Sequence, residues 1–380
     1  MDFDLSDEQR MIQEMVADFS ASELAPHAAE IDRTERFPIE IYRKLNELGL
    51  CGMNVPEEYG GSGAGAVALS LALTEITKGD ASVGVTTSVT NMVAESIFRY
   101  GNEEQRKRFL PLIFDSDHPI ASFALTEPQA GSDAGNIQTR AIKDGDHYVL
   151  NGTKLFITSG AYASVFLVLA RTLKVPGAKG ISAFVIPQKT PGLIIGKEEK
   201  KMGLRGSNTV SINLEDCRVP ASNLIGDEGN GFQIAMSALD SGRIGIASQA
   251  LGIGLISLKE AMSFAKERIQ FGKPISELQA IQFKLADIAT LLETSRLLIM
   301  RAASLKDSKK PFTLEACMAK VFSTEAANKC VSEALQIHGG YGYVSEYPIE
   351  RHLRDVKVST IYEGTSEIQR LVISRRILQV

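Results

Sequence analysis

A glutamate near the end of the chain stands in a setting suited to proton transfer. Glu363 is followed by Gly364, and Ser366 and Gln369 have the spacing of a capping box, which predicts that a helix begins just after Gly364. The free N–H groups at a helix start favour an anion nearby. A carboxylate in this position could act as a general base, although a lone glutamate in a loop is more often an ordinary surface residue.

A polar loop in the first half of the chain could hold a ligand. Residues 123–133 read Phe-Ala-Leu-Thr-Glu-Pro-Gln-Ala-Gly-Ser-Asp, so that a strand is expected to end in a loop of Gly, Ser and Thr. Such loops expose N–H groups and hydroxyls that can bind a phosphate or the polar edge of a ring. On this ground alone, an ordinary surface turn is the simpler interpretation.

Two more segments carry an aromatic or a charge in a notable place. Residues 154–159 predict a strand with Phe156 on one face, which core packing would also explain. Residues 239–243 are expected to open a helix, where the charge of Arg243 opposes the helix dipole. That mismatch indicates a bound anion or carbonyl, although a solvated arginine explains it equally well.

Two predicted helices end in glycine. Residues 267–272, with Pro274 behind them, predict a helix that stops at Gly272. A second helix is expected over residues 313–337, followed by Gly339-Gly340. A glycine pair lets the backbone approach a ligand closely, but it is also an ordinary helix end.

The elements that must position these residues change type twice along the chain. Ser6 and Gln9 have the spacing of a capping box, and helical spacing is expected after them and over residues 39–48, 66–78, 89–100 and 103–114. From Pro119 to about Pro220, strands are expected at 165–172, 181–187 and 210–214, and Asn151-Gly152 predicts a β-hairpin between residues 147–150 and 153–158. After Gly231, helices return.

Composition excludes several classes of protein. The net charge of -5 argues against a general nucleic-acid binder. The longest purely apolar run, Val165 to Ala170, falls far short of the roughly 18 residues of a membrane-spanning helix. The four cysteines contain no Cys-x-x-Cys pair, so we expect reduced thiols and no metal site. The acidic start lacks the features of a signal peptide, so we expect a bacterial cytoplasmic protein, or a mitochondrial matrix protein if it is a processed eukaryotic chain.

Taken together, the five segments resemble those of the acyl-CoA dehydrogenases. Residues 361–370, Ile-Tyr-Glu-Gly-Thr-Ser-Glu-Ile-Gln-Arg, match the C-terminal signature of that family almost letter for letter, and the other segments occur in the right order. The resemblance implies an α+β fold with an N-terminal α-helical domain (1–119), a middle antiparallel β-barrel or sandwich domain (120–228) and a C-terminal four-helix bundle domain (229–380).

The resemblance also implies a reaction and its site. FAD would oxidise a saturated acyl-CoA to the trans-2-enoyl-CoA, with Glu363 removing the α-proton and its backbone N–H stabilising the enolate oxygen. The implied FAD contacts are Phe123, Leu125, Thr126, Gly131, Ser132, Phe156, Ile157, Thr158, Arg268, Phe271, Gln279, Gln336, Ile337, Gly339, Gly340, Thr365 and Glu367. The implied substrate contacts are Ser132, Asp240, Arg243, Tyr362 and Gly364.

Partners follow from the same resemblance. Because Arg268 is expected to reach the FAD of a neighbouring subunit, a homotetramer built as a dimer of dimers is implied, with electron-transferring flavoprotein as electron acceptor. We expect the nearby helix start to lower the pKa of Glu363 and desolvation by a bound acyl chain to raise it, with desolvation prevailing.

Departures from the family pattern narrow the prediction. Gly242 stands where some members carry their base, which leaves Glu363, and Phe156 stands where many relatives have Trp. Residues 243–252 are most similar to the short-chain, butyryl-type members. The alternatives are another chain length or a branched substrate, an oxidase or monooxygenase of the same fold, or a non-catalytic flavoprotein scaffold. No Gly-x-Gly-x-x-Gly follows a predicted strand, which argues against an NAD enzyme.

Overall fold

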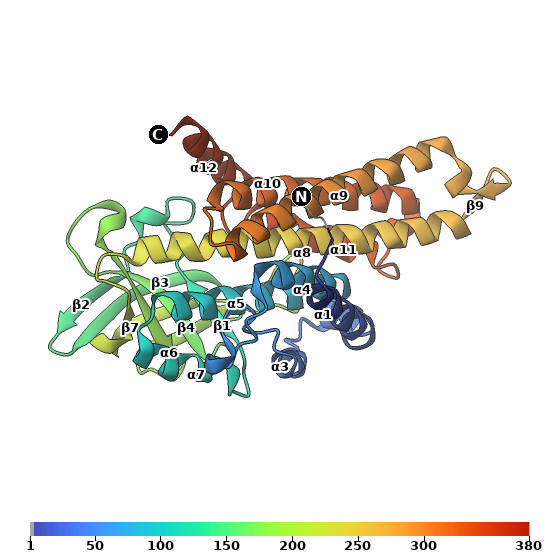
Figure 1. Ribbon diagram of the computed structural model, residues 1–380. Helices are drawn as coiled ribbons and strands as arrows, with labels where there is room; N and C mark the ends of the chain where they lie inside the picture. Colours follow the sequence, from blue (N-terminus) through green and yellow to red (C-terminus); the bar gives the residue numbers. More distant parts are fainter. Residues whose placement is uncertain (1–3, 380) are drawn as a thin grey trace.

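The computed structural model describes residues 4–379, which form a helical part, a sheet and a second helical part in chain order (Figure 1). The first part contains α1 (Asp7–Phe19), a π-helical turn (Ser20–Leu24), α2 (Ala28–Thr34), α3 (Ile39–Glu47), α4 (Gly65–Gly79), α5 (Ala81–Tyr100), α6 (Glu103–Phe109) and α7 (Pro111–Phe114). The predicted capping box is confirmed, since Ser6 and Gln9 bond each other's backbone N–H at the start of α1.

Two boundaries in this part differ from the predictions. Helix α5 begins at Ala81 rather than near residue 89, because Asp80 caps it by accepting hydrogen bonds from the N–H groups of Ser82 and Val83. Residues 81–88 are rich in Ser, Thr and Gly, which are weak helix formers, and their burial overrides that preference. The helix expected over residues 103–114 is divided at Pro111, which removes a backbone donor.

The middle part is a mixed sheet in the order β6-β7-β3-β2-β4-β5-β8, with β1 paired to β4. Most neighbours are antiparallel, as predicted, while β4 runs parallel to both β1 and β2. The strands are β1 (Ala121–Ala124), β2 (Arg140–Asp144), β3 (His147–Thr158), β4 (Val165–Arg171), β5 (Ile181–Pro187), β6 (Leu193–Glu198), β7 (Thr209–Pro220) and β8 (Leu224–Ile225).

The hairpin predicted at Asn151-Gly152 is wrong, because β3 runs straight through this dipeptide with a register shift against β7. The turn lies instead at Gly145-Asp146, where Gly145 has φ 62. A methyl group on Gly152 would lie 2.4 Å from Oγ1 of Thr139. This glycine therefore allows a close approach between strands and does not make a turn.

The second helical part contains α8 (Gly231–Glu267), α9 (Gln279–Asp307), α10 (Thr313–His338), α11 (Ile349–Lys357) and α12 (Ser366–Leu378). Helices α8, α9 and α10 pack against one another, and α8 also packs on α4 and α5, so it is shared by both helical parts. In Figure 1, α8 to α10 protrude beyond the rest of the molecule, and α12 projects from the upper side.

The helix predicted to stop at Gly272 ends earlier, at Glu267. Residues 269–274 form a small hairpin, β9 (Ile269–Gln270) and β10 (Lys273–Pro274), at the tip of the protruding helices. Phe271 and Gly272 form its turn with φ values of 52 and 78, as expected of a two-residue turn that needs positive φ.

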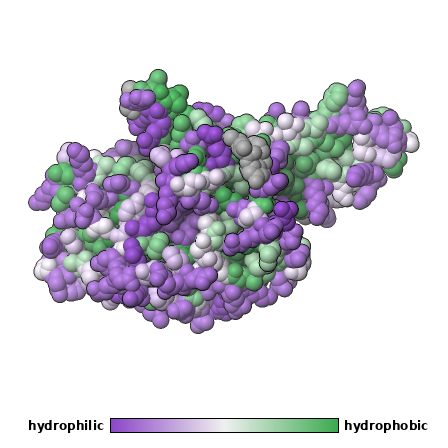
Figure 2. Space-filling model, in the orientation of Figure 1, coloured by the Kyte–Doolittle hydropathy of each residue, from purple (hydrophilic) through white to green (hydrophobic). Residues whose placement is uncertain are grey.

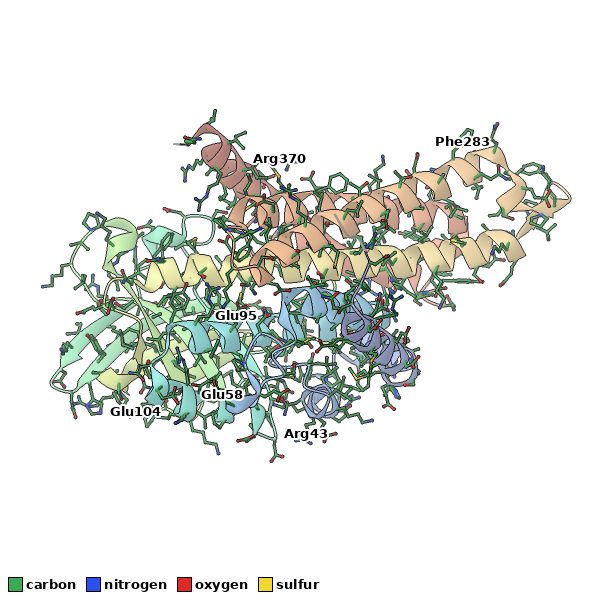
Figure 3. The ribbon with its side chains drawn as sticks, in the orientation of Figure 1. Arg43, Glu58, Glu95, Glu104, Phe283 and Arg370 are labelled. Carbon is green, nitrogen blue, oxygen red and sulfur yellow. The ribbon has the colours of Figure 1, made fainter. Side chains whose placement is uncertain are left out.

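Apolar side chains gather on the outside of this protruding end and on α12 (Figure 2). Phe283 points away from α9 (Figure 3), with 60% of its surface exposed. Within residues 4–379, no helix is long and apolar enough to cross a membrane. All four cysteines are free and buried, as predicted.

Candidate active site

Glu363 lies in the short loop between a 3-10 turn (Val358–Thr360) and α12. Its backbone is left-handed, with φ 54, and Gly364 follows with φ 89. Helix α12 begins just after Gly364, as predicted, but its N-cap is Thr365, whose side chain accepts a hydrogen bond from the N–H of Ile368. The capping box proposed for Ser366 and Gln369 is wrong, because Ser366 is already the first helical residue.

The carboxyl group of Glu363 faces α8 at Gly242. A methyl group on Gly242 would lie 2.6 Å from Oε2 of Glu363 and 2.9 Å from the sulfur of Met92, so the glycine makes room for the carboxylate. Although part of the residue is exposed, Oε2 is buried and has no hydrogen-bond partner. It is therefore free to receive a proton from a ligand.

Burial raises the pKa of Glu363 to about 7, while the positive charges of Arg243 and Lys320 act to lower it. We expected desolvation to prevail over a helix start once a ligand had closed the site. In the structure, the protein itself desolvates the group, and two cationic side chains oppose the effect. A carboxyl group with a pKa near neutral is suited to act as a general base.

Three buried polar side chains from three helices hold the loop in place. Lys320 of α10 donates to the carbonyl of Gly364 over 2.7 Å, and Gln369 of α12 donates to the carbonyls of Glu363 and Gly364. The hydroxyl of Tyr362 donates to Gln249 of α8. Lys320, Gln369 and Gln249 were not identified as site residues from the sequence. The available signal for each was a polar residue within a helical segment.

The predicted substrate contacts on α8 form their own cluster. Asp240 accepts from Arg243 and from the hydroxyl of Thr313 over 2.6 Å, and Arg243 also contacts the sulfur of Cys317. Arg243 is buried, and its Nε has no partner. The expectation that Arg243 opens a helix is wrong, since α8 begins at Gly231. The helix dipole therefore explains nothing here, and the burial of the guanidinium is the informative feature.

The first group of predicted FAD contacts lies where β1 and β3 end. The hydroxyl of Ser122 donates to the carbonyl of Thr158, and the N–H of Leu155 donates to the carbonyl of Thr126. These bonds bring residues 123–132 beside residues 156–158. Gly131 and Ser132 are exposed, and a side chain on Gly131 would meet open space, so the loop leaves its backbone accessible.

A buried ion pair supports this loop. Lys154 is fully buried and donates to Glu127 over 2.7 Å and to the carbonyl of Leu125 over 3.0 Å. Burial opposes the ionisation of Glu127, but the charge of Lys154 and the N–H of Gln138 outweigh it and lower its pKa. Burial lowers the pKa of Lys154 to about 8, even though Glu127 favours its charged form. Because both carboxylate oxygens are also bonded to the backbone, we regard the pair as ionised.

Phe156 has the features of a ligand platform. It lies in a strand at a register shift, with φ 56, and 62% of its side chain is exposed. A left-handed backbone is unfavourable for a residue with a Cβ, and such strain concentrates at functional sites. The neighbouring Ile157 is buried, so the bulge turns the aromatic ring alone outward. An exposed flat ring beside an accessible polar loop fits a planar cofactor such as a flavin.

The second group of predicted FAD contacts lies at the opposite end of the helices. Arg268 lies over the ring of Tyr341 at 5.2 Å, and His338 stacks on Phe264 at 4.5 Å. These contacts bring the end of α8 next to the end of α10. The predicted contacts at or near this end are Arg268, Phe271, Gln279, Gln336, Ile337, Gly339 and Gly340.

Helix geometry shows how far apart the two groups lie. Lys320, beneath the Glu363 loop, and His338 are separated along α10 by roughly 27 Å at 1.5 Å per residue. Gly242 and Glu267 are separated along α8 by roughly 37 Å. Within one chain, the structure therefore does not bring Arg268 and its neighbours to Glu363.

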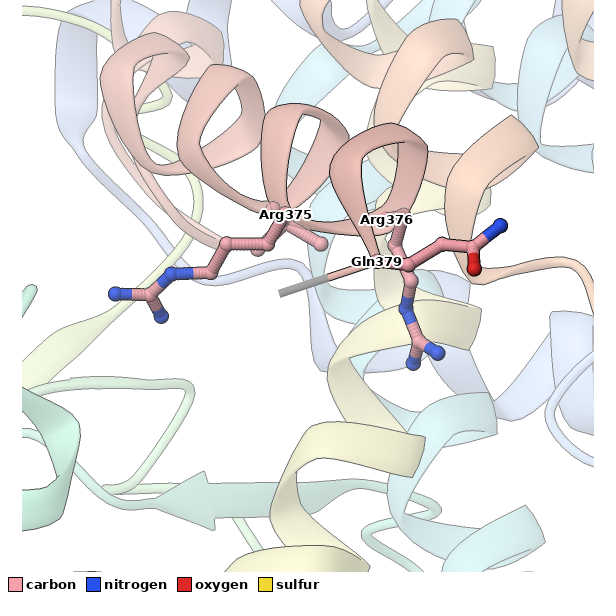
Figure 4. A pocket seen from close by; sticks show the side chains of 4 residues that line it. Arg375, Arg376 and Gln379 are labelled. Atoms are coloured by element: carbon pink, nitrogen blue, oxygen red, sulfur yellow. The ribbon is translucent and has the colours of Figure 1, made fainter.

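Two hollows of about 460 Å³ lie near α12. One is lined in part by Thr365 and Glu367, two predicted FAD contacts, together with Lys357. The other is lined by Val372, Arg375, Arg376 and Gln379 (Figure 4). Arg376 also acts electrostatically on Asp240, which places its charge near the α8 cluster. Neither hollow includes Glu363.

Unpaired polar atoms concentrate around Glu363. Among residues 4–379, nine buried side-chain polar atoms lack a hydrogen-bond partner, and five of these belong to Arg243, Ser323, Glu363, Ser366 and Gln369. Native interiors leave few such groups, and each requires an explanation such as a ligand or a catalytic role. In the same described range, no group of His, Cys, Asp and Glu is arranged to hold a metal ion.

Comparison with known proteins agrees with this geometry. The models of the acyl-CoA dehydrogenase N-terminal, middle and C-terminal domains match residues 6–117, 122–217 and 229–378. The mitochondrial short-chain specific acyl-CoA dehydrogenase of Bos taurus is 50% identical over 377 residues, which cover 99% of this chain and 91% of that protein.

Solved structures agree as well. Butyryl-CoA dehydrogenase from Megasphaera elsdenii is 43% identical over all of both chains, with a TM-score of 0.97. A chain in the structure of the electron-transferring flavoprotein of Acidaminococcus fermentans is 45% identical, also over all of both chains, with a TM-score of 0.98. The chain therefore belongs to the acyl-CoA dehydrogenase family of FAD-dependent oxidoreductases.

Proposed function

We propose that this protein oxidises short-chain acyl-CoA thioesters to the trans-2-enoyl-CoA, with Glu363 as the base that removes the α-proton. The observation that carries the proposal is the buried, unpaired Oε2 of Glu363, held in a left-handed loop opposite Gly242. The similarity to a short-chain acyl-CoA dehydrogenase and to a butyryl-CoA dehydrogenase supports the substrate class.

The residues of the chain prepare the proton transfer. The carboxylate of Glu363 takes the α-proton, and its raised pKa gives it more affinity for that proton than a carboxylate in water has. Arg243 and Lys320 favour the ionised form before substrate binds. We propose that the backbone N–H of Glu363 donates to the thioester oxygen as negative charge develops there. Bound FAD, held next to Phe156 and the loop of residues 123–132, would supply the acceptor for the hydride that leaves the β-carbon.

We propose that each FAD is held by two subunits. Residues 123–132 and 156–158 of one chain provide the loop and the aromatic face, together with Thr365 and Glu367. Arg268, Phe271, Gln279 and residues 336–340 come from a neighbour, because within one chain residue 336 already lies roughly 24 Å from Lys320 along α10 and the end of α8 lies roughly 37 Å from Gly242. The exposed aromatic residues at that end, Phe271 at 89% and Phe283 at 60%, support a subunit contact. A homotetramer built as a dimer of dimers satisfies this requirement.

We place the CoA group along α8 and α12. On α8, Arg243 lies near Glu363 and binds Asp240, and Arg375 and Arg376 line the hollow at the end of α12. Guanidinium groups are suited to phosphate, so these two arginines are the proposed partners of the CoA phosphates. We assign Ser132, Tyr362 and Gly364 to the acyl end. The proposed electron acceptor is an electron-transferring flavoprotein.

An anaerobic titration with butyryl-CoA, followed by flavin absorbance, tests the proposal. We expect the yellow band to bleach and a long-wavelength charge-transfer band to appear. The Glu363→Gln variant should keep FAD and its fold but lose flavin reduction. A rate within tenfold of the unaltered protein would rule out Glu363 as the base, and a yellow protein that does not bleach would rule out the substrate.

A further inference from the structure

Lys320 lies completely buried beneath the loop that carries Glu363. Its Nζ donates to the carbonyl of Gly364 over 2.7 Å. Burying an ammonium group is unfavourable unless an opposite charge and hydrogen bonds compensate for the lost water. A neutral donor could satisfy the same carbonyl, as the amide of Gln369 already does over 3.0 Å. The choice of lysine therefore requires a reason beyond anchoring the loop.

The conformation of the loop gives one part of that reason. Glu363 and Gly364 are consecutive left-handed residues, with φ values of 54 and 89. Because such a backbone is unfavourable for a residue with a Cβ, neighbouring groups must hold it. Lys320 and Gln369 bind the Gly364 carbonyl from two different helices. They thereby fix the direction in which the side chain of Glu363 leaves the backbone.

The charges around Glu363 give the other part. Arg243 of α8 and Lys320 of α10 face the carboxyl group, the phenol of Tyr362 lies beside it, and α5 contributes the uncharged Met92. Arg243 is ion-paired with Asp240 over 2.5 Å. Lys320 binds a neutral carbonyl and makes no ion pair of its own among the described residues.

The groups that face Lys320 show which acidic side chain its charge acts on. Burial lowers the pKa of Lys320 to about 8, while Glu363, Cys317 and Glu325 favour its charged form and Arg243 disfavours it. Glu325 is paired with Arg370 on the surface, and Cys317 is a buried thiol. Glu363 is therefore the unpaired acidic group whose ionised form the charge of Lys320 stabilises most.

We propose that Lys320 is a positioning residue for the reaction: its ammonium anchors the Gly364 carbonyl and sets a positive charge, balanced by no ion pair of its own, beside the Glu363 carboxylate, whose ionised form it favours. This inference rests on the proposed role of Glu363 as base. An opposite charge at close range lowers the pKa of a carboxyl group, so removal of Lys320 must move the pKa of Glu363 upward.

Three substitutions separate charge from anchoring. Lys320→Met keeps the apolar stem but removes the charge and the hydrogen bond to the Gly364 carbonyl. Lys320→Gln keeps a short neutral donor, and Lys320→Arg keeps the charge. Lys329→Met removes a charge from the exposed side of the same helix and serves as the matched control. Two readouts apply to each protein: the pH dependence of flavin reduction by butyryl-CoA in a single turnover, and the carboxyl C=O band of Glu363 in infrared difference spectra, with Glu363→Gln as the blank.

We expect Lys320→Met to raise the pKa of Glu363 by about one unit or more in both readouts. With a starting pKa of about 7, a shift of one unit makes reduction at pH 7 roughly fivefold slower. Lys320→Gln should show a similar shift, while Lys320→Arg and Lys329→Met should keep the original profile.

An unchanged profile in Lys320→Met would overturn the proposal. If that variant loses its fold or its FAD, an unchanged infrared pKa in Lys320→Gln would overturn it instead. Failure of the proposed function looks different: Glu363→Gln would remain active, or the unaltered protein would not be reduced at all.

Discussion

Replacing Gly242 by alanine tests whether the position of the Glu363 carboxylate controls the rate. The new methyl group would lie 2.6 Å from Oε2 and 2.9 Å from Cδ of Glu363. Since non-bonded contacts are comfortable only at about 3.5 Å or more, the carboxyl group must retreat by roughly 1 Å. A displacement of that size at a reacting group lowers the rate on the order of 100-fold.

The stability of this variant should change much less than its rate. Alanine in place of glycine inside a helix stabilises by roughly 1 kcal/mol, and the atoms that must move are the ends of two flexible side chains, Glu363 and Met92. We therefore expect the free energy of unfolding of Gly242→Ala to stay within about 1 kcal/mol of the original value.

The assay is single-turnover flavin reduction by butyryl-CoA, together with urea unfolding. Gly254→Ala is the matched control on the same helix, because its methyl group would meet Leu292 at 2.4 Å, far from Glu363. It should lower stability and leave the rate unchanged. A Gly242→Ala protein that is reduced at the original rate would refute the reasoning, because the carboxylate could then act from another position.

Three further predictions follow from the buried charges and the exposed helix ends. Burial raises the pKa of Glu363 from 4.5 to about 7, so the folded state binds this proton more tightly and stability falls as the pH rises through that window. Glu363→Gln should therefore increase the free energy of unfolding at pH 8 by up to about 3 kcal/mol and change it little at pH 4; the same effect at both pH values in urea unfolding would contradict this. Lys154→Met leaves the carboxylate of Glu127 buried without its ion pair and should destabilise by about 3–5 kcal/mol. Adding Glu127→Gln should restore much of that loss, and a double variant no more stable than the single one in thermal unfolding would count against the pairing. Arg268→Gln changes a residue at the exposed helix ends and should leave the circular dichroism spectrum unchanged while weakening FAD retention tenfold or more; undiminished FAD binding in dialysis would argue against a site completed by a second subunit.

Local patterns were enough to predict most of the elements. The strand expected at residues 210–214 lies within β7, and the capping box of Ser6 and Gln9 predicted the start of α1. Both depend on neighbours within a few residues. The predictions at Asn151-Gly152, Gly272 and Arg243 were wrong, and at Gly152 a contact distant in sequence is the reason. Gly152 is small to accommodate Thr139, which directly precedes the neighbouring strand β2.

The sequence by itself determined the family, the order of the three parts and Glu363 as the candidate base, because signatures and periodicity are properties of short segments. Only the tertiary structure decided what surrounds that base. Gln249, Lys320 and Gln369 lie on three helices and meet at one loop. Their roles depend on how α8, α10 and α12 pack, and the pKa of Glu363 depends on the burial that this packing creates. Spacing along a chain carries no information about either.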